Sequence, residues 1–189
     1  MASRGRGNAG QAVKIVITGP FAAGKTTLIR TISEITVLST EREVTDNTRS
    51  TKRETTVAMD FGRISIDRDL VLYLFGTPGQ ERFDFMWDVV STGTVGYVLL
   101  VDPSRPESMT EAAGILLAFR GLTSAPYVVA VNRHAELSDE QVAWVREQVG
   151  CDEWAPVVGC VATDRESVKG VLLELLYTVL DRLDYQAVG

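Results

Sequence analysis

Residues 13–27 read VKIVITGPFAAGKTT, and this stretch sets the prediction of the fold. The run from Val13 to Gly19 is rich in β-branched residues and ends in glycine, which predicts a buried strand. A helical pattern follows Gly24. Between strand and helix lies G-x-x-x-x-G-K-[ST], the pattern of a phosphate-binding loop. It arises by chance in roughly one chain of this length in a hundred, and its place between strand and helix lowers that figure further.

The chemistry of a bound polyphosphate explains the residue types in this loop. Glycine at two positions permits dihedrals and a close backbone approach that a side chain forbids. The helix that follows presents unpaired N–H groups to the phosphates. Lys25 is predicted to reach the β- and γ-phosphates, and the hydroxyl of Thr26 to ligate Mg²⁺. The predicted nucleotide-binding residues of the loop are Gly19, Pro20, Phe21, Ala22, Ala23, Gly24, Lys25, Thr26 and Thr27. Phe21 is expected to shield the site from water and to block an arginine supplied by a partner.

Strand and helix patterns alternate along the rest of the chain. This alternation predicts an α/β fold of the P-loop NTPase type, with a doubly wound, mostly parallel six-stranded sheet and helices on both faces. Ligands of such sheets bind at the carboxyl ends of the strands. The polar segment Thr36–Thr55 is interpreted as a long loop. The helix predicted over Arg165–Leu183 carries an apolar stripe that is expected to pack in the core throughout, including Leu180 and Leu183.

Length and composition indicate one globular domain. The chain has 189 residues and a net charge of −6, which argues against a broad nucleic-acid surface. The predicted organisation is a disordered tail over 1–12, one domain over 13–185 and a short tail over 186–189. Two cysteines, no secretory signal, no apolar run near the ~20 residues of a membrane helix and no lipid-anchor motif predict a cytoplasmic protein without direct membrane insertion.

The stretch LYLFGTPGQERF, over 72–83, resembles the second switch of Ras-superfamily GTPases. That resemblance implies that the amide of Gly79 meets the γ-phosphate and that Gln80 orients the attacking water. Gly76 occupies the position of the family's metal-serving aspartate, and its loss is expected to weaken Mg²⁺ binding without abolishing it. TTVAMDF resembles the first switch, which makes Thr56 the second Mg²⁺ ligand, with Thr55 as the alternative.

VNRHAE, at the end of the fifth predicted strand, resembles the Asn-Lys-x-Asp motif that reads guanine. By that resemblance Asn132 contacts the base and Arg133 stacks on it, while the backbone N–H of Ala162 meets the guanine oxygen. Ala135 stands in the aspartate position, and Glu136 is either a displaced substitute or a solvated side chain. Without the carboxylate, guanine loses charge-assisted hydrogen bonds of roughly 1.5–3 kcal/mol.

Together these motifs look closest to the prokaryotic MglA-like GTPases, in particular the actinobacterial conservon type. That resemblance implies a slow, Mg²⁺-dependent GTPase switch in which Gln80, Lys25 and Thr56 serve catalysis. It also implies a roadblock-type regulatory protein and a sensor-kinase-like membrane protein as partners, with recruitment to the membrane through them. The alternative is a degraded GTPase that binds nucleotide weakly or not at all and acts as a scaffold.

Overall fold

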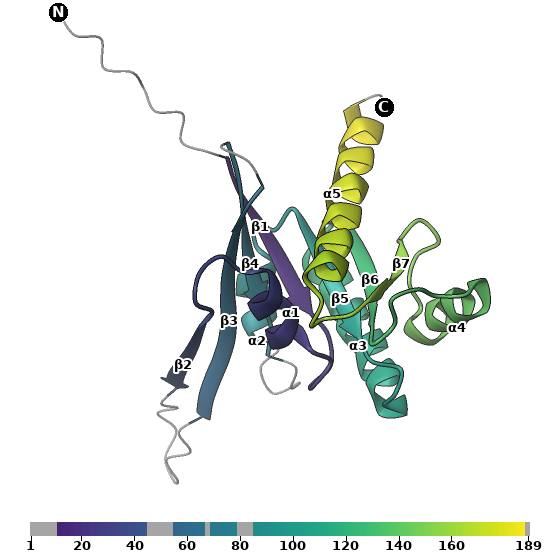
Figure 1. Ribbon diagram of the computed structural model, residues 1–189, viewed down its shortest axis with the longest axis horizontal. Helices are drawn as coiled ribbons and strands as arrows, with labels where there is room; N and C mark the ends of the chain where they lie inside the picture. Colours follow the sequence, from purple (N-terminus) through teal and green to yellow (C-terminus); the bar gives the residue numbers. More distant parts are fainter. Residues whose placement is uncertain (1–10, 45–54, 67–68, 79–84, 188–189) are drawn as a thin grey trace, which may run out of the picture.

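The computed structural model describes residues 11–44, 55–66, 69–78 and 85–187, which form a seven-stranded sheet with five helices (Figure 1). The strands are β1 (Gln11–Thr18), β2 (Leu38–Val44), β3 (Thr55–Ser65), β4 (Leu70–Gly76), β5 (Gly96–Val101), β6 (Tyr127–Asn132) and β7 (Val157–Cys160). The helices are α1 (Lys25–Ile32), α2 (Phe85–Ser91), α3 (Pro106–Leu122), α4 (Asp139–Val149) and α5 (Arg165–Ala187). The predicted class, a mostly parallel α/β sheet of the P-loop NTPase type, is confirmed.

The strand order is β2-β3-β4-β1-β5-β6-β7, with β1 near the middle. β1 pairs in parallel with β4 and β5, and β6 and β7 continue the parallel part. β3 runs antiparallel to β4, and β2 antiparallel to β3. The carboxyl ends of β1, β4, β5 and β6 therefore meet at one edge of the sheet, where ligands of such folds bind.

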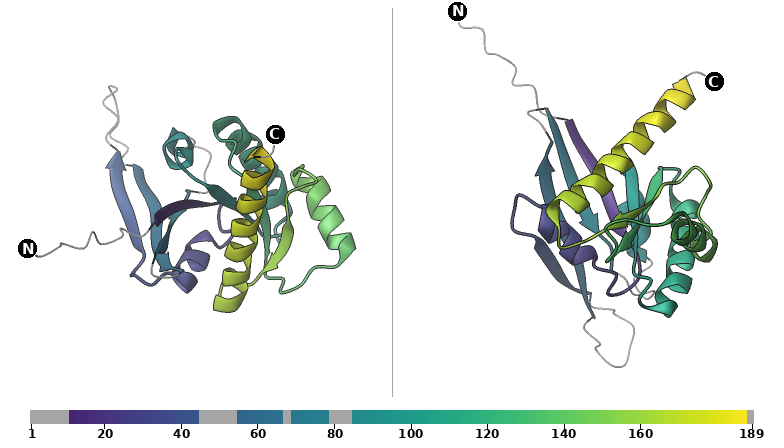
Figure 2. Two further views of the ribbon diagram at one scale, coloured as in Figure 1. Left: turned by 90° about the horizontal axis from the view of Figure 1, so that it is seen from above. Right: turned by 45° about the vertical axis from the view of Figure 1, so that its right-hand side comes forward.

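Two hydrophobic cores lie on the two faces of the sheet (Figure 2). Alternate residues of one strand enter different cores, as Ile15 and Ile17 of β1 do on one side and Val16 on the other. α1 and α5 cover the first face, and α2, α3 and α4 cover the second. Because the parallel strands are buried on both faces, they read as continuous apolar runs rather than as alternating ones.

β2 corrects the prediction of a loop over Thr36–Thr55 and raises the number of strands from six to seven. The strand pairs with the first half of β3, from Leu38 opposite Phe61 to Val44 opposite Thr55. Its sequence, LSTEREV, is polar because an edge strand needs no continuous apolar face. Hydropathy alone therefore does not predict β2 as a strand. Residues 45–54 of the same segment lie outside the described residues.

α5 begins where predicted but packs differently along its length. Val168, Val171, Leu172 and Leu175 are buried in the core, as expected. Leu180 and Leu183 are each 56% exposed, so the prediction that the whole stripe packs in the core is wrong. The reason is that α5 extends past the sheet, as Figures 1 and 2 show, so its second half has less sheet to cover.

β1 starts at Gln11 and α5 ends at Ala187, so both elements reach into the ranges predicted as tails, and residues 1–10 and 188–189 lie outside the described part. Cys151 and Cys160 are free thiols. No helix in the described part of the chain has the length and apolar content to cross a membrane.

Phe119→Ala tests the second core. The Phe119 ring is fully buried and lies 5.7 Å from the Trp87 ring and 5.1 Å from the Tyr97 ring, centroid to centroid. Truncation leaves a cavity, and we expect the free energy of unfolding to fall by about 3–5 kcal/mol. Leu117→Ala is the matched control, since Leu117 lies on the same helix and is 71% exposed. Urea unfolding measures both, and equal losses would contradict this description of the core.

Candidate functional site

The phosphate loop lies so close to the ends of β5 and β6 that two of its positions exclude a side chain. A Cβ at Gly19 would overlap the carbonyl oxygen of Leu100, and one at Gly24 would lie 2.5 Å from Nδ2 of Asn132. Both glycines have positive φ, 140° and 105°, which glycine adopts readily. Ala22 has a φ of 58°, which is uncommon for a residue with a side chain. This backbone leads directly into α1, with Gly24 as its N-cap.

Lys25, the first residue of α1, folds its side chain back into the loop. Its Nζ donates hydrogen bonds to the carbonyl oxygens of Gly19 and Pro20, both at 2.6 Å. Burial lowers the pKa of Lys25 to about 8, and the nearby charges of Asp60 and Glu111 oppose that shift only in part. The ammonium group is therefore buried against the backbone of the phosphate loop.

Asp60 of β3 supplies a carboxylate next to the loop. The hydroxyl of Thr26 donates a hydrogen bond to Oδ2 of Asp60, and Asp60 lies in register with Gly76 at the end of β4. A Cβ at Gly76 would lie 2.8 Å from Cδ1 of Ile29 and 3.1 Å from Cβ of Asp60, so a larger residue has no room there. The carboxylate missing from the end of β4 thus has a counterpart on the neighbouring strand.

Sequence reasoning did not single out Asp60, although a signal was present. Side chains alternate between faces along a strand, so Asp60 shares a face with Gly62 and Ile64. Ile64 is buried in the core that α1 covers. An acidic residue on a core-facing position of a strand is unusual, and that is the feature that marks Asp60.

Asn132, at the end of β6, joins three segments of the site. Its Nδ2 donates to the carbonyl oxygen of Ala23 at 2.8 Å. Its Oδ1 accepts the backbone N–H groups of Arg133 at 2.9 Å and Ala162 at 3.1 Å. The side chain is buried, and both of its polar atoms have hydrogen-bond partners. The N–H of Ala162, predicted to meet a base oxygen, is used here to hold Asn132.

Arg133 lies beside Asn132 and forms an ion pair with the carboxylate of Asp102 at the end of β5. Its Nε donates to Oδ2 of Asp102 at 2.7 Å, and the backbone of Arg133 has a φ of 69°. Burial alone would raise the pKa of Asp102, but hydrogen bonds from Ser104 and Arg133 lower it overall. The carboxylate therefore stays charged and orients the exposed arginine side chain at the mouth of the site.

The positions that read guanine in the predicted motif do not converge here. Ala135 and Glu136 are both exposed. His134 forms a β-bridge with Cys160, and its Nδ1 lies 3.1 Å from the carbonyl oxygen of Asn132. A Cβ at Gly159 would lie 2.6 Å from the carbonyl oxygen of His134, so this loop packs tightly on β7. In this tightly packed loop Glu136 is a solvent-exposed side chain.

Some of the other predicted site residues lie on the loop and α1, and others lie on β3 or outside the described residues. Phe21 is 57% exposed, and its carbonyl oxygen accepts a hydrogen bond from Arg105 at 2.9 Å, which ties the loop to the start of α3. Thr27 lies exposed on α1. Thr56 lies in β3 opposite Glu43, and its role as a Mg²⁺ ligand stays a prediction. Gly79 and Gln80 lie outside the described residues.

This loop and its surroundings define a nucleotide-binding protein of the P-loop class. A family model described as "Conserved hypothetical ATP binding protein" matches residues 17–182. The chain therefore belongs to that family of conserved hypothetical ATP-binding proteins. It is also 28% identical to the uncharacterized protein MJ1339 of Methanocaldococcus jannaschii over 121 residues, which are 64% of this chain and 70% of that protein.

The family match overturns the resemblance to Ras-superfamily, MglA-like and conservon-type GTPases. The motifs behind that resemblance are short loops at strand ends, where the demands of phosphate binding impose similar residues on different proteins of one fold. The base-reading motif, which distinguishes guanine, was the part that failed to match. The roadblock-type and sensor-kinase-like partners followed from the resemblance alone, and the family match does not support them.

We expect nucleotide binding to take up a proton above about pH 8. The Lys25 ammonium of the free protein has a pKa of about 8, whereas bound phosphates favour its charged form. Below this pH the group is already protonated, so its contribution to binding is constant. As the pH rises further, each binding event must first protonate Lys25, and affinity falls by up to about tenfold per pH unit.

Titration calorimetry in buffers of different ionisation enthalpy measures this proton uptake. Lys25→Arg is the control, because a guanidinium stays charged throughout the range. Equal uptake by the parent and by Lys25→Arg would show that another group is responsible.

Proposed function

We propose that this protein binds ATP together with Mg²⁺ and hydrolyses it slowly, as a nucleotide-dependent switch whose two states a protein partner reads. The observation that carries the proposal is the phosphate loop. Its positive-φ glycines lead into the N-terminus of α1 at the carboxyl edge of the sheet, and the Lys25 ammonium folds back onto the same loop. The family description supports ATP as the nucleotide.

The residues of the loop divide the work of holding a triphosphate. Backbone N–H groups at the start of α1 donate to phosphate oxygens. Lys25 exchanges its two carbonyl partners, on Gly19 and Pro20, for oxygens that carry more negative charge. Asn132 keeps the loop seated by holding the carbonyl of Ala23.

The donor set beside the loop fits Mg²⁺. Thr26 and Asp60 present a hydroxyl and a carboxylate, the hard oxygen donors that this ion prefers, and substrate phosphates usually complete its coordination. Bound there, the ion would supply positive charge that stabilises the charge developing on the phosphates. The described residues contain no cluster of three or more acidic, histidine or cysteine side chains that could hold a metal by themselves. Thr56 stays a prediction as a further ligand.

Hydrolysis would be an in-line attack of water on the γ-phosphorus. Lys25 stabilises the charge that develops on the phosphate oxygens. The water-orienting role of Gln80, which lies outside the described residues, stays a prediction. A side chain that only positions water gives a slow reaction, because nothing in this set replaces the transition-state charge of an arginine finger.

The residues in the base-reading positions do not form a guanine-specific site, and this favours ATP as the nucleotide. A guanine reader presents a carboxylate to N1–H and N2–H, and the residue at that position is Ala135, with Glu136 exposed beside it. The residue next to Asn132 is Arg133, whose guanidinium can stack on any base. We therefore expect ATP to bind at least as well as GTP.

GTP is the second candidate, favoured by one observation. Asn132 occupies the place of the guanine-reading asparagine and is tied to the phosphate loop and to Ala162, the segments that such an asparagine joins. Under this alternative GTP would bind at least tenfold more tightly than ATP, since a site built for specific hydrogen bonds rejects analogues strongly. The same titration separates the two.

Calorimetric titration of the purified protein with ATP and GTP, with and without Mg²⁺, tests the proposal. Lys25→Ala removes charge-assisted hydrogen bonds to the phosphates, and we expect affinity to fall about 10- to 100-fold. Arg30→Ala, at an exposed position in the last turn of α1, is the control and should bind like the parent. Absence of binding by every common nucleoside triphosphate would support a scaffold without nucleotide and refute the proposal.

Asp60→Asn tests the proposed metal site. The change removes the carboxylate charge but keeps an oxygen that can accept from Thr26. We expect the Mg²⁺ concentration needed for tight nucleotide binding to rise about 10- to 100-fold, while binding without Mg²⁺ is unchanged. Asp88→Asn, exposed on α2, serves as the control. Gly76→Asp should fail to substitute and should lower stability, because its Cβ would press against Ile29 and Asp60. Unaltered Mg²⁺ dependence in Asp60→Asn would exclude the carboxylate from the site.

A further inference from the structure

The exposed half of α5 carries an apolar face that the fold does not use. Leu173, Leu176, Leu180 and Leu183 are spaced by three, four and three residues and therefore share one face of the helix; we name them the α5 ridge. Leu173 is 41% exposed, and the last two are each 56% exposed. A row of partly exposed leucines at this spacing is the pattern of a helix that packs against another helix.

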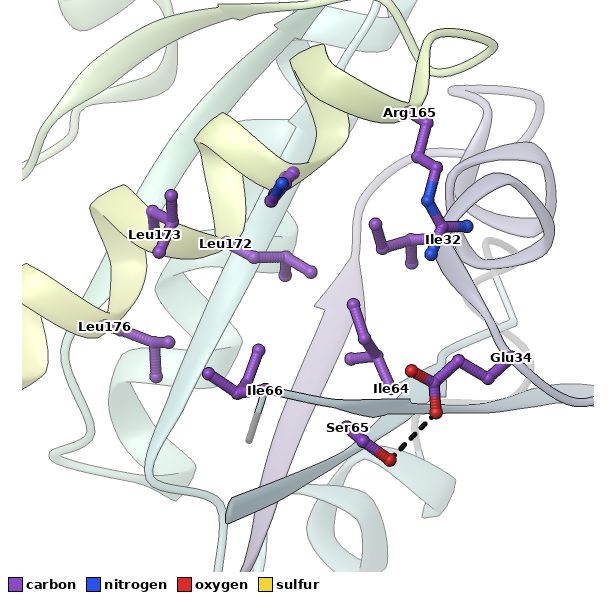
Figure 3. Close-up of a pocket in the computed structure, with 10 residues that line it drawn as sticks. Ile32, Glu34, Ile64, Ser65, Ile66, Arg165, Leu172, Leu173 and Leu176 are labelled. Atoms are coloured by element: carbon purple, nitrogen blue, oxygen red, sulfur yellow. Dashed lines mark hydrogen bonds between the residues drawn. The ribbon is translucent and has the colours of Figure 1, made fainter. Parts of the chain in front are cut away.

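A groove borders the first half of this ridge (Figure 3). Its volume is about 310 Å³. Ile64 of β3 and Ile66, just after the strand, form one wall, and Leu172, Leu173 and Leu176 of α5 form the other. Arg165 and Lys169 line the same groove, toward the start of α5. Glu34 and Ser65 line it as well, so the groove is apolar along its length and carries charges of both signs at the end near the start of α5.

Groove and ridge are parts of one continuous surface. Leu173 and Leu176 belong to both, and Leu180 and Leu183 continue the same helix face beyond Ile66. Figures 1 and 2 show the second half of α5 extending past the edge of the sheet. The first half of the ridge therefore has a strand beside it and the second half has none among the described elements.

We propose that α5 pairs in antiparallel orientation with α5 of a second copy of this chain. A two-fold axis near Tyr177 sets Leu180 and Leu183 of each copy against Leu176 and Leu173 of the other. The protruding half of one helix then enters the groove of its partner, and the exchange is mutual. An isologous contact of this kind requires a surface that complements itself, which a groove and a ridge on the same helix provide.

The charges of α5 favour this orientation. Arg165 and Lys169 outnumber Glu166 near its start, and Asp181 and Asp184 outnumber Arg182 near its end. Antiparallel pairing brings Lys169 of one copy near Asp184 of the other, whereas parallel pairing would set like charges side by side. The ion pair between Lys169 and Glu166, at 3.6 Å, is exposed and therefore weak, so Lys169 can take the new partner.

The size of the surface indicates a dimer of moderate affinity. Residues 165–184 of α5 form a helix about 30 Å long, which together with the groove gives an interface at the low end of the usual range of about 1,200–2,000 Å² in total. We therefore expect a dimer that dissociates on dilution in the micromolar range.

Analytical ultracentrifugation of the whole protein over a dilution series tests the proposal. Leu180→Arg places a charge in the centre of the ridge and should raise the dissociation constant of the dimer about 30-fold or more. Leu117→Arg, on α3, is the matched control: Leu117 is 71% exposed and should tolerate the change without effect on association. Lys169→Glu and Asp184→Lys should each weaken the dimer, and the two together should restore it.

A second measurement gives the orientation. Tyr177→Cys in a Cys151→Ser background should form a disulfide between two copies under mild oxidation, because position 177 lies near the two-fold axis. Leu117→Cys in the same background should not. A parent that stays monomeric up to about 1 mM, or a charge-swapped double variant no better than the singles, would overturn the proposal. So would a dimer that Leu180→Arg leaves intact.

Discussion

The close approach of the phosphate loop to the ends of β5 and β6 governs the rest of the site. The backbone at Gly19 lies against the carbonyl of Leu100, and the side chain of Asn132 holds Ala23 on one side and Ala162 on the other. Three loops that are distant in sequence are thereby connected through one buried amide. Since the partners of that amide are backbone groups, the geometry depends on the sheet that carries Asn132 and little on the neighbouring side chains.

Burial of charge follows from this packing. An ammonium group removed from water is costly unless it is paired, and the loop meets Lys25 with two of its own carbonyl oxygens. Carbonyl dipoles compensate less than full charges do, which leaves the group with a lowered pKa. Asp60 contributes the nearest opposite charge from a strand that does not belong to the loop at all. The site is therefore assembled from β1, α1, β3 and β6, although only the first two are adjacent in sequence.

Local patterns predicted the buried parallel strands, the helices and the phosphate loop, because each depends on neighbouring residues. β2 was missed because an edge strand can be polar, and Leu180 and Leu183 were misassigned because helical spacing does not reveal where the sheet ends. The family was misjudged for a related reason: loops that meet phosphate look alike in proteins whose base contacts and partners differ. Asp60 escaped notice because its role depends on the register of β3 with β4.

The sequence alone therefore determined the class of fold and the place where phosphate chemistry is expected, since a glycine-lysine loop between a strand and a helix contains its own geometric requirements. The tertiary structure decided which carboxylate stands beside Thr26, where Asn132 directs its amide and how much of α5 remains uncovered. These outcomes depend on strand order, register and the length of the sheet. Such properties arise when distant segments meet, and no short stretch of residues encodes them.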